Sequence, residues 1–255
     1  MTAPDTRTAP DGASALVLRH APGAPQAAVL LLHGGRADGL TAPTWLNLPG
    51  RRMRPFASAA LRAARPHPLL VAEVRYRHRG WNGPRGDAAR DARRALDELR
   101  DLTAPDLPVV LVGHSMGGRA ALRVAGDPRV AGVVALAPWC PAGEPVEQLE
   151  GRTLLVLHDE RDRITEAGRS WTYLARARAA GAHGAGIVMP QGRHAMLRDA
   201  GAWHRLTGLG AAAALGLAAL PEPLRAAADG PGDGRTTAAE VLAALDHPRP
   251  GRLGP

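Results

Sequence analysis

Lysine is absent from this sequence, and cysteine occurs only once, at Cys140. A single cysteine cannot form a disulfide within the chain, and cysteine-based metal sites are not expected. Aromatic residues make up only 3%, so the core has to be built mainly from Ala, Val and Leu, for which a hydrophobic content of 45% is sufficient. A length of 255 residues suits one sizeable domain.

Long hydrophobic runs are also missing. The longest, Gly208–Leu220, is too short and too rich in Ala and Gly to span a bilayer. Residues 1–12 are polar and lack the apolar segment of a signal peptide, so we expect a disordered tail there. These features predict a cytoplasmic protein without a membrane span.

Arginine alone carries the excess of positive charge, which amounts to a net +8. A charge of this size can indicate nucleic-acid binding. Here the arginines are scattered, and many stand beside acidic residues, as in Arg90–Arg94 and Glu160–Arg163. This pattern favours a solvated surface, so we predict no specific nucleic-acid partner. No basic cluster is evident that would bind a carboxylate or phosphate on a substrate.

Short apolar runs alternate along the chain with helix-like segments. Several runs are continuous, as expected for parallel strands that are buried on both faces. Such alternation implies βαβ units, and hence an α/β fold with a mostly parallel sheet and helices on both faces. The predicted strands are Ala15–Arg19, Ala27–Leu32, Leu69–Tyr76, Val109–Val112, Val130–Leu136, Thr153–Leu157 and Gly186–Met189. The predicted helices are Arg52–Ala64, Asp87–Asp101, Met116–Ala125, Thr165–Ala180 and Asp199–Leu206.

The composition changes near residue 206, which suggests a division of the chain. We expect an α/β domain at residues 13–206, followed by a helical extension and flexible tail at residues 207–255. Ala228–Arg235 is expected to be a linker, and Thr237–Leu245 a short helix capped by a threonine. For this extension, packing or a partner contact is expected rather than a role in an active site.

One stretch carries the strongest chemical signal. The apolar run Val109–Val112 ends in the Gly-x-Ser-x-Gly motif of residues 113–117, and a helix-prone segment follows at once. A strand, a sharp turn and a helix in this order lift the serine hydroxyl above a sheet, and the glycines permit the close approach of strand and helix. Ser115 is therefore the predicted nucleophile.

A serine needs a base, a carboxylate that orients the base, and donors for the oxyanion. His33-Gly34-Gly35 follows a predicted strand, and its glycines leave backbone N–H groups unobstructed. We predict that the N–H groups of Gly35 and Met116 form the oxyanion hole. The imidazole of His33 is expected to be structural.

The acid and the base come later in the chain. Three carboxylates follow the strand at Thr153–Leu157, namely Asp159, Glu160 and Asp162, and the residues alone do not decide between them. His194 follows the nucleophile and these acids, in a loop between a strand and a helix, which distinguishes it from the other histidines.

Together these segments, over about Ala27–Leu206, resemble the α/β-hydrolase superfamily. Its chain order of nucleophile, acid and histidine implies a triad of Ser115, Asp162 and His194. Asp159 stands where the family often has a glycine, three residues before the acid. The resemblance implies an α/β-hydrolase fold and an acyl-enzyme mechanism that needs no metal or organic cofactor.

Many members of the superfamily carry a cap between strands 6 and 7 of the family numbering. Here that connection is Ala137–Arg152, which is too short for a substantial lid and predicts little or no cap. Gly34, Trp45 and Trp139 are the predicted pocket residues, with core packing as the alternative for the tryptophans. The expected substrate is a small or medium uncharged ester.

Three functions are compatible with these residues. The first is a serine esterase acting on carboxylic esters. The second is a thioesterase, acyltransferase, peptidase or perhydrolase that uses the same triad. The third is a non-catalytic hydrolase-fold protein that binds a ligand or partner, which the intact Ser, Asp and His disfavour. The sequence predicts neither the natural substrate nor the oligomeric state.

Overall fold

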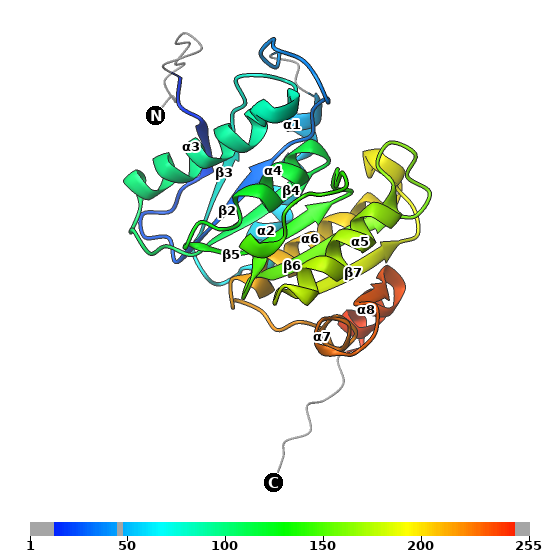
Figure 1. Ribbon diagram of the computed structural model, residues 1–255. Coiled ribbons are helices and arrows are strands. Elements are labelled where there is room, and N and C mark those ends of the chain that lie inside the picture. The colour runs from blue at the N-terminus through cyan, green and yellow to red at the C-terminus, as the bar shows by residue number, and fades with distance from the viewer. Residues whose placement is uncertain (1–12, 45–47, 248–255) are drawn as a thin grey trace.

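A computed structural model describes residues 13–44 and 48–247, and its centre is one eight-stranded sheet (Figure 1). The strands follow the order β1-β3-β2-β4-β5-β6-β7-β8. Only β1 is antiparallel to its neighbour, β3, and the other pairs are parallel. The strands are β1 (Leu16–His20), β2 (Ala27–Leu32), β3 (Leu69–Val74), β4 (Val109–His114), β5 (Val130–Leu136), β6 (Thr153–Asp159), β7 (His183–Met189) and β8 (Arg235–Thr237).

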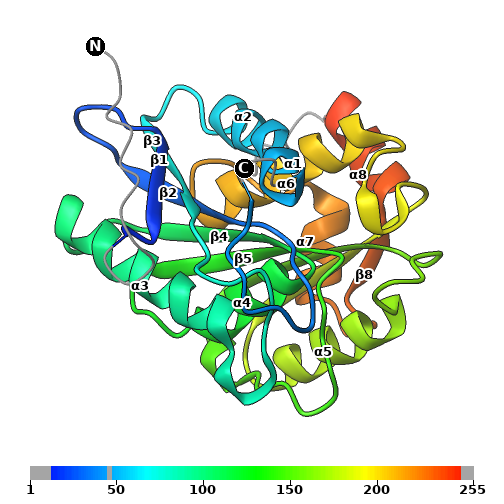
Figure 2. The same cartoon turned by 90° about the horizontal axis from the view of Figure 1, so that it is seen from above.

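Helices cover both faces of the sheet, as Figure 2 shows, with α2, α6 and α8 on one side and α3, α4 and α5 on the other. The central strands β2, β3 and β4 are buried at every position because they have a helical layer on each face. This confirms the predicted α/β fold. The helices are α1 (Leu48–Arg52), α2 (Arg54–Ala63), α3 (Asp87–Leu102), α4 (Met116–Val124), α5 (Ala167–Ala179), α6 (Ala200–Ala214), α7 (Glu222–Asp229) and α8 (Ala238–Asp246).

The spacing of apolar residues along each helix explains which side of the helix packs on the sheet. In α3 the buried positions include Ala88, Ala92, Ala95 and Leu99, which recur at helical spacing and face the sheet. The connection between β5 and β6 contains only one short 3-10 turn, Glu147–Leu149, so little or no cap covers the sheet there. Among residues 13–44 and 48–247, no helix combines the length and apolar character that crossing a bilayer requires.

The segment after residue 206 is built into the same body as the rest. The predicted helix ended at Leu206, but α6 continues to Ala214, so the predicted division falls inside one helix. Gly208 and Gly210 allow this continuation because a Cβ at either position would overlap Ala59 of α2 or Leu155 of β6. The change in composition near residue 206 therefore does not mark a domain boundary. It reflects the small residues that let α6 pack closely on α2 and β6.

The remainder of the segment adds a strand and two helices. β8 pairs in parallel with β7, which extends the sheet by one strand. The expected linker before it is held in place by Arg178 of α5, whose guanidinium donates to the carbonyls of Gly230 and Gly232 at 2.7 and 2.8 Å. The predicted final helix is present as α8, and Thr237 caps it together with Glu240.

A truncation tests whether this segment is required for folding. A chain that ends at Leu206 would lose half of α6 and leave apolar surface that Leu224 and Val241 now cover, since both are fully buried. We expect this chain to be insoluble or to lack a cooperative thermal transition, as monitored by circular dichroism.

The matched control is a chain that ends at His247, which retains every described helix and strand. It should unfold within a few degrees of the full chain. A cooperative transition near that of the full chain for the variant ending at Leu206 would contradict the prediction and show that residues 207–255 are dispensable for the fold.

Candidate active site

Ser115 occupies the sharp turn between β4 and α4. Its backbone has φ 54° and ψ −118°, a region that non-glycine residues rarely adopt. A Cβ on Gly113 would overlap the backbone of Gly117 and Gly118, and one on Gly117 would overlap the carbonyl oxygens of Leu32 and His33. Glycine at these two positions is therefore a packing requirement of the turn.

The three residues of the expected triad lie in hydrogen-bond contact. His194 Nε2 is 3.0 Å from Ser115 Oγ, and His194 Nδ1 is 2.8 Å from Asp162 Oδ2. With Nδ1–H donated to the carboxylate, Nε2 is left as the acceptor for the serine hydroxyl proton. Ser115 and Asp162 are buried, and the imidazole of His194 is 18% exposed.

Asp162 is satisfied by hydrogen bonds on both carboxylate oxygens. Oδ1 accepts from the backbone N–H groups of Ile164 and Thr165, and Oδ2 accepts from the hydroxyl of Thr165 as well as from His194. Burial alone would raise the pKa of Asp162, but hydrogen bonds from His158 and His194 outweigh it and hold the pKa well below its usual range. The carboxylate is therefore ionised at neutral pH.

The other two carboxylates of this segment, Asp159 and Glu160, do not contact His194. Asp159 accepts from the N–H of Arg193 at 2.8 Å and from the N–H of Arg161 at 2.9 Å, so it ties the end of β6 to the loop that carries His194. Glu160 is exposed and lies 3.7 Å from Arg235 of β8. Of the three, only Asp162 contacts the imidazole of His194.

A second histidine on Asp162 was not anticipated from the sequence. His158, the sixth residue of β6, is fully buried, and its Nε2 lies 3.2 Å from Asp162 Oδ2. Its Nδ1 lies 2.9 Å from Ser170 Oγ on α5. Two imidazoles thus contact the Asp162 carboxylate: His194, which also reaches Ser115, and His158, which is buried between β6 and α5. A histidine that ends an apolar run gave no distinctive signal in the sequence.

The loop before α6 has an unusual backbone. Gly192, Arg193, Met196 and Asp199 all have positive φ. The carbonyl of His194 accepts from Nε2–H of His114 at 2.9 Å, which fixes the loop over the turn at Ser115. Burial, with a further contribution from His194, lowers the pKa of His114 to about 3, so this ring is neutral and can serve as a structural donor.

The loop after β2 lies directly against the nucleophile turn. A Cβ on Gly34 would lie 3.4 Å from Ser115 Cβ, and one on Gly35 would overlap the side chain of Met116. Within the described residues, neither the Gly35 N–H nor the Met116 N–H has a hydrogen-bond acceptor. Both N–H groups are thus available beside Ser115.

The segment after β3 holds this loop in place. The N–H of Arg36 donates to the carbonyl of Arg79 at 3.0 Å, and the N–H of Trp81 donates back to the carbonyl of Arg36 at 2.9 Å. Gly80 permits this contact because a Cβ there would overlap Gly39.

Two of the three predicted pocket residues lie in the described part of the chain. Gly34 is beside Ser115, as stated above. Trp139 is half-buried and packs on Arg119, whose guanidinium lies 4.5 Å from the centre of its ring and 3.9 Å from that of Trp81. Trp45 lies outside the described residues. The described residues contain no group of three His, Cys, Asp or Glu side chains that could hold a metal ion.

Sequence comparison places the chain in a known family. A sequence profile described as "Alpha/beta hydrolase family" matches residues 29–250. The chain belongs to the alpha/beta hydrolase family. A search of curated protein sequences found no match.

Several solved structures share the fold. An alpha/beta hydrolase enzyme from a Medee basin deep-sea metagenome library has 19% identity and a TM-score of 0.58, covering 75% of this chain and 86% of that one. An esterase from Pyrococcus furiosus has 16% identity and a TM-score of 0.57, covering 73% and 81%. An acetyl ester-xyloside bifunctional hydrolase from Caldicellulosiruptor lactoaceticus has 16% identity and a TM-score of 0.56, covering 76% and 85%. At these identities the likeness establishes a shared fold.

The acid dependence of stability tests the environment of Asp162. Because the pKa of Asp162 is lowered in the folded protein, its ionised form stabilises the fold above the unfolded pKa of about 3.9. This contribution is lost as the pH falls toward the lower folded value. The free energy of unfolding should therefore differ most between wild type and Asp162→Asn at neutral pH, and the difference should shrink below about pH 4.

Urea denaturation at a series of pH values would measure this difference. Glu160→Gln is the control, because Glu160 is an exposed acid on the same loop and should change stability little at any pH. A gap between wild type and Asp162→Asn that stays constant or widens as the pH falls would contradict the prediction.

Proposed function

We propose that this protein is a serine hydrolase that cleaves carboxylic esters through an acyl-enzyme. The observation that carries the proposal is the continuous set of hydrogen bonds from Ser115 Oγ through His194 to Asp162 Oδ2. Nucleophile, base and orienting carboxylate stand in the relation that serine hydrolysis requires. Membership of the alpha/beta hydrolase family and the shared fold with esterases support the same activity.

In the first half of the reaction, Ser115 Oγ attacks the ester carbonyl carbon while its proton passes to His194 Nε2. Asp162, which remains ionised, stabilises the resulting imidazolium through Nδ1–H. The imidazolium then gives its proton to the alkoxide oxygen, the carbon–oxygen bond of the ester breaks, and an alcohol leaves. In the second half a water molecule gives its proton to Nε2 and attacks the acyl carbon, and Ser115 recovers its proton as the acid departs.

Negative charge develops on the carbonyl oxygen in each tetrahedral intermediate. The N–H groups of Gly35 and Met116 are the proposed donors, because both lack another acceptor within the described residues and both flank Ser115. Losing one such donor typically costs about 3–4 kcal/mol in transition-state stabilisation. Met116 begins α4, so the helix dipole adds to its effect on the oxyanion.

The short connection between β5 and β6 supports a substrate of small or medium size that enters an uncovered site. Gly34 is the proposed contact beside the reacting carbonyl, since a side chain there would crowd Ser115. Trp139 remains a proposed pocket residue, although its ring already stacks with Arg119.

Substitution of the triad tests this function directly. Ser115→Ala should abolish covalent labelling by a fluorophosphonate and turnover of 4-nitrophenyl acetate. Asp162→Asn should lower kcat by about 10⁴-fold, because the imidazole then loses the tautomer that can accept the serine proton. Labelling followed by mass spectrometry, together with steady-state kinetics, would measure both effects.

Glu160→Gln is the matched control, and it should retain wild-type turnover because Glu160 lies at the surface. Asp159→Asn should have an intermediate effect, since Asp159 positions Arg193 and does not touch the imidazole. Equal activity of Asp162→Asn and wild type would overturn the assignment of the acid. Absence of labelling in the wild type would favour a non-catalytic binding protein.

The oxyanion assignment is tested by Gly35→Ala. The added Cβ would overlap the Met116 side chain and the carbonyl of Arg79, so the loop has to move away from Ser115. We expect kcat to fall by about 10²–10³-fold, with labelling slowed but not abolished. Gly23→Ala is the control because a Cβ there meets no atom within 4 Å. Unchanged turnover in Gly35→Ala would show that the loop does not supply an oxyanion donor.

A further inference from the structure

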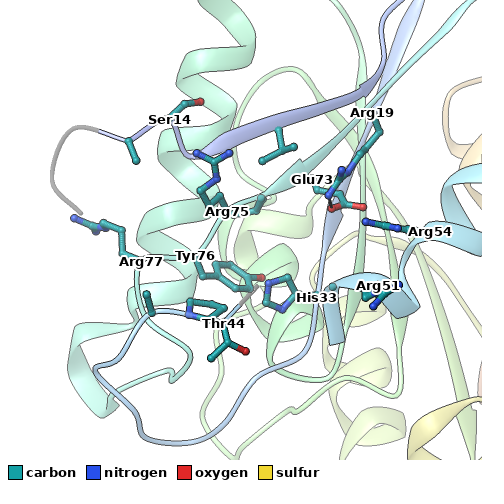
Figure 3. Close-up of a pocket in the computed structure, with 16 residues that line it drawn as sticks. Ser14, Arg19, His33, Thr44, Arg51, Arg54, Glu73, Arg75, Tyr76 and Arg77 are labelled. Carbon is teal, nitrogen blue, oxygen red and sulfur yellow. Dashed lines mark hydrogen bonds and ion pairs between the residues drawn. The ribbon is translucent and has the colours of Figure 1, made fainter. Parts of the chain in front are cut away.

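A cavity separate from the triad lies at the edge of the sheet formed by β1 and β3. Its volume is about 570 Å³, and α1, α2 and the loop at residues 42–44 complete its walls (Figure 3). None of Ser115, Asp162 and His194 lines it. His33, which directly precedes Gly34 and Gly35 in the sequence, is one of its lining residues.

Five arginines line this cavity, more than any other type of residue among its described lining. Two of its arginines are neutralised, since Arg19 pairs with Glu73 at 2.6 Å and Arg77 pairs with the buried Asp91 at 2.7 Å. The other three, Arg51, Arg54 and Arg75, form no ion pair with any residue in the described part of the chain. Arg51 of α1 and Arg54 of α2 lie on the same side of the cavity in Figure 3, whereas the side chain of Arg75, at the end of β3, points away from them toward Ser14. All three side chains are exposed, and one side of the cavity therefore carries two positive charges, on Arg51 and Arg54, that no described acid pairs with.

Two buried polar groups in the same cavity lack a partner. The Tyr76 hydroxyl and Glu73 Oε1 have no hydrogen-bond partner among the described residues, although Tyr76 is only 2% and Glu73 only 7% exposed. Leaving such groups unsatisfied is costly, and a bound water, ion or ligand can satisfy them. Burial raises the pKa of Tyr76, so its hydroxyl keeps its proton and can donate. Glu73 Oε1 can only accept.

These features together define the chemistry of a ligand. Arginine guanidinium groups bind phosphate and carboxylate oxygens in paired, charge-assisted hydrogen bonds. Glu73 Oε1 would repel an anionic oxygen and instead requires a donor such as a hydroxyl group. We propose that this cavity binds a small organic anion, carrying a phosphate or a carboxylate together with at least one hydroxyl group. The anionic group faces Arg51 and Arg54, and the hydroxyl donates to Glu73.

Isothermal titration calorimetry of the full chain tests this proposal with defined probes. Glycerol 3-phosphate and glycerate each carry one anionic group and hydroxyl groups, and they distinguish a phosphate from a carboxylate preference. Inorganic phosphate lacks the hydroxyl-bearing carbon chain, and glycerol lacks the anion. We expect saturable binding of glycerol 3-phosphate or glycerate at 0.15 M salt, weaker binding of inorganic phosphate, and none of glycerol.

Variants locate the binding in the cavity. Arg51→Gln and Arg54→Gln should each weaken binding about tenfold, and Tyr76→Phe should weaken it less, because it removes a neutral donor. Arg62→Gln is the matched control, since Arg62 is an exposed arginine further along α2 that does not line the cavity. It should bind the probe as the wild type does.

Two results would overturn the proposal. The first is the absence of saturable binding by both organic anions. The second is an equal loss of binding in Arg62→Gln and Arg54→Gln, which would indicate non-specific attraction to a basic protein. The readout does not depend on ester cleavage, and Arg54→Gln should leave turnover of 4-nitrophenyl acetate unchanged. This proposal and the esterase proposal can therefore fail separately.

Discussion

The backbone conformation of Ser115 is the constraint on which the site depends. A positive φ at a serine costs about 1–3 kcal/mol and persists only where the surroundings enforce it. Here the N–H of Ser115 donates to Leu136 at the end of β5, and its carbonyl accepts from the N–H groups of Arg119 and Trp139. The elbow is thus bonded to the next strand, to its own helix and to the connection that follows. These three hydrogen bonds hold Ser115 in its strained conformation.

Around this turn, a single carboxylate organises the remaining groups. Asp162 receives hydrogen bonds from two imidazoles, a hydroxyl and two backbone N–H groups, so it is ordered without any contribution from Ser115. The loop of His194 is fixed separately, by Asp159 at one end and by His114 over the elbow. These hydrogen bonds hold Asp162 and His194 in position before a substrate binds. The groups that stabilise charge in the transition state therefore do not have to rearrange during the reaction.

Much of this arrangement follows from local patterns, and part of it does not. The parallel strands and the elbow at Ser115 could be predicted because each is encoded within a few neighbouring residues. Three acids stand at the end of β6 or directly after it, and only the return of the loop in space distinguishes Asp162 from Asp159 as the partner of His194. His158 could not be found because its role depends on α5 folding over β6. The arginine cavity was missed for a similar reason, since its residues are distant in sequence and only the sheet edge gathers them.

The short strand β8 has a consequence for how this protein behaves among its own copies. Unpaired sheet edges are templates on which other chains can add strands. Here one edge ends in β8, only three residues long, which passes directly into a helix. The opposite edge is β1, whose pairing with β3 shifts register between Leu18 and His20. Neither end of the sheet therefore offers a long, regular strand on which the strand of another copy could add.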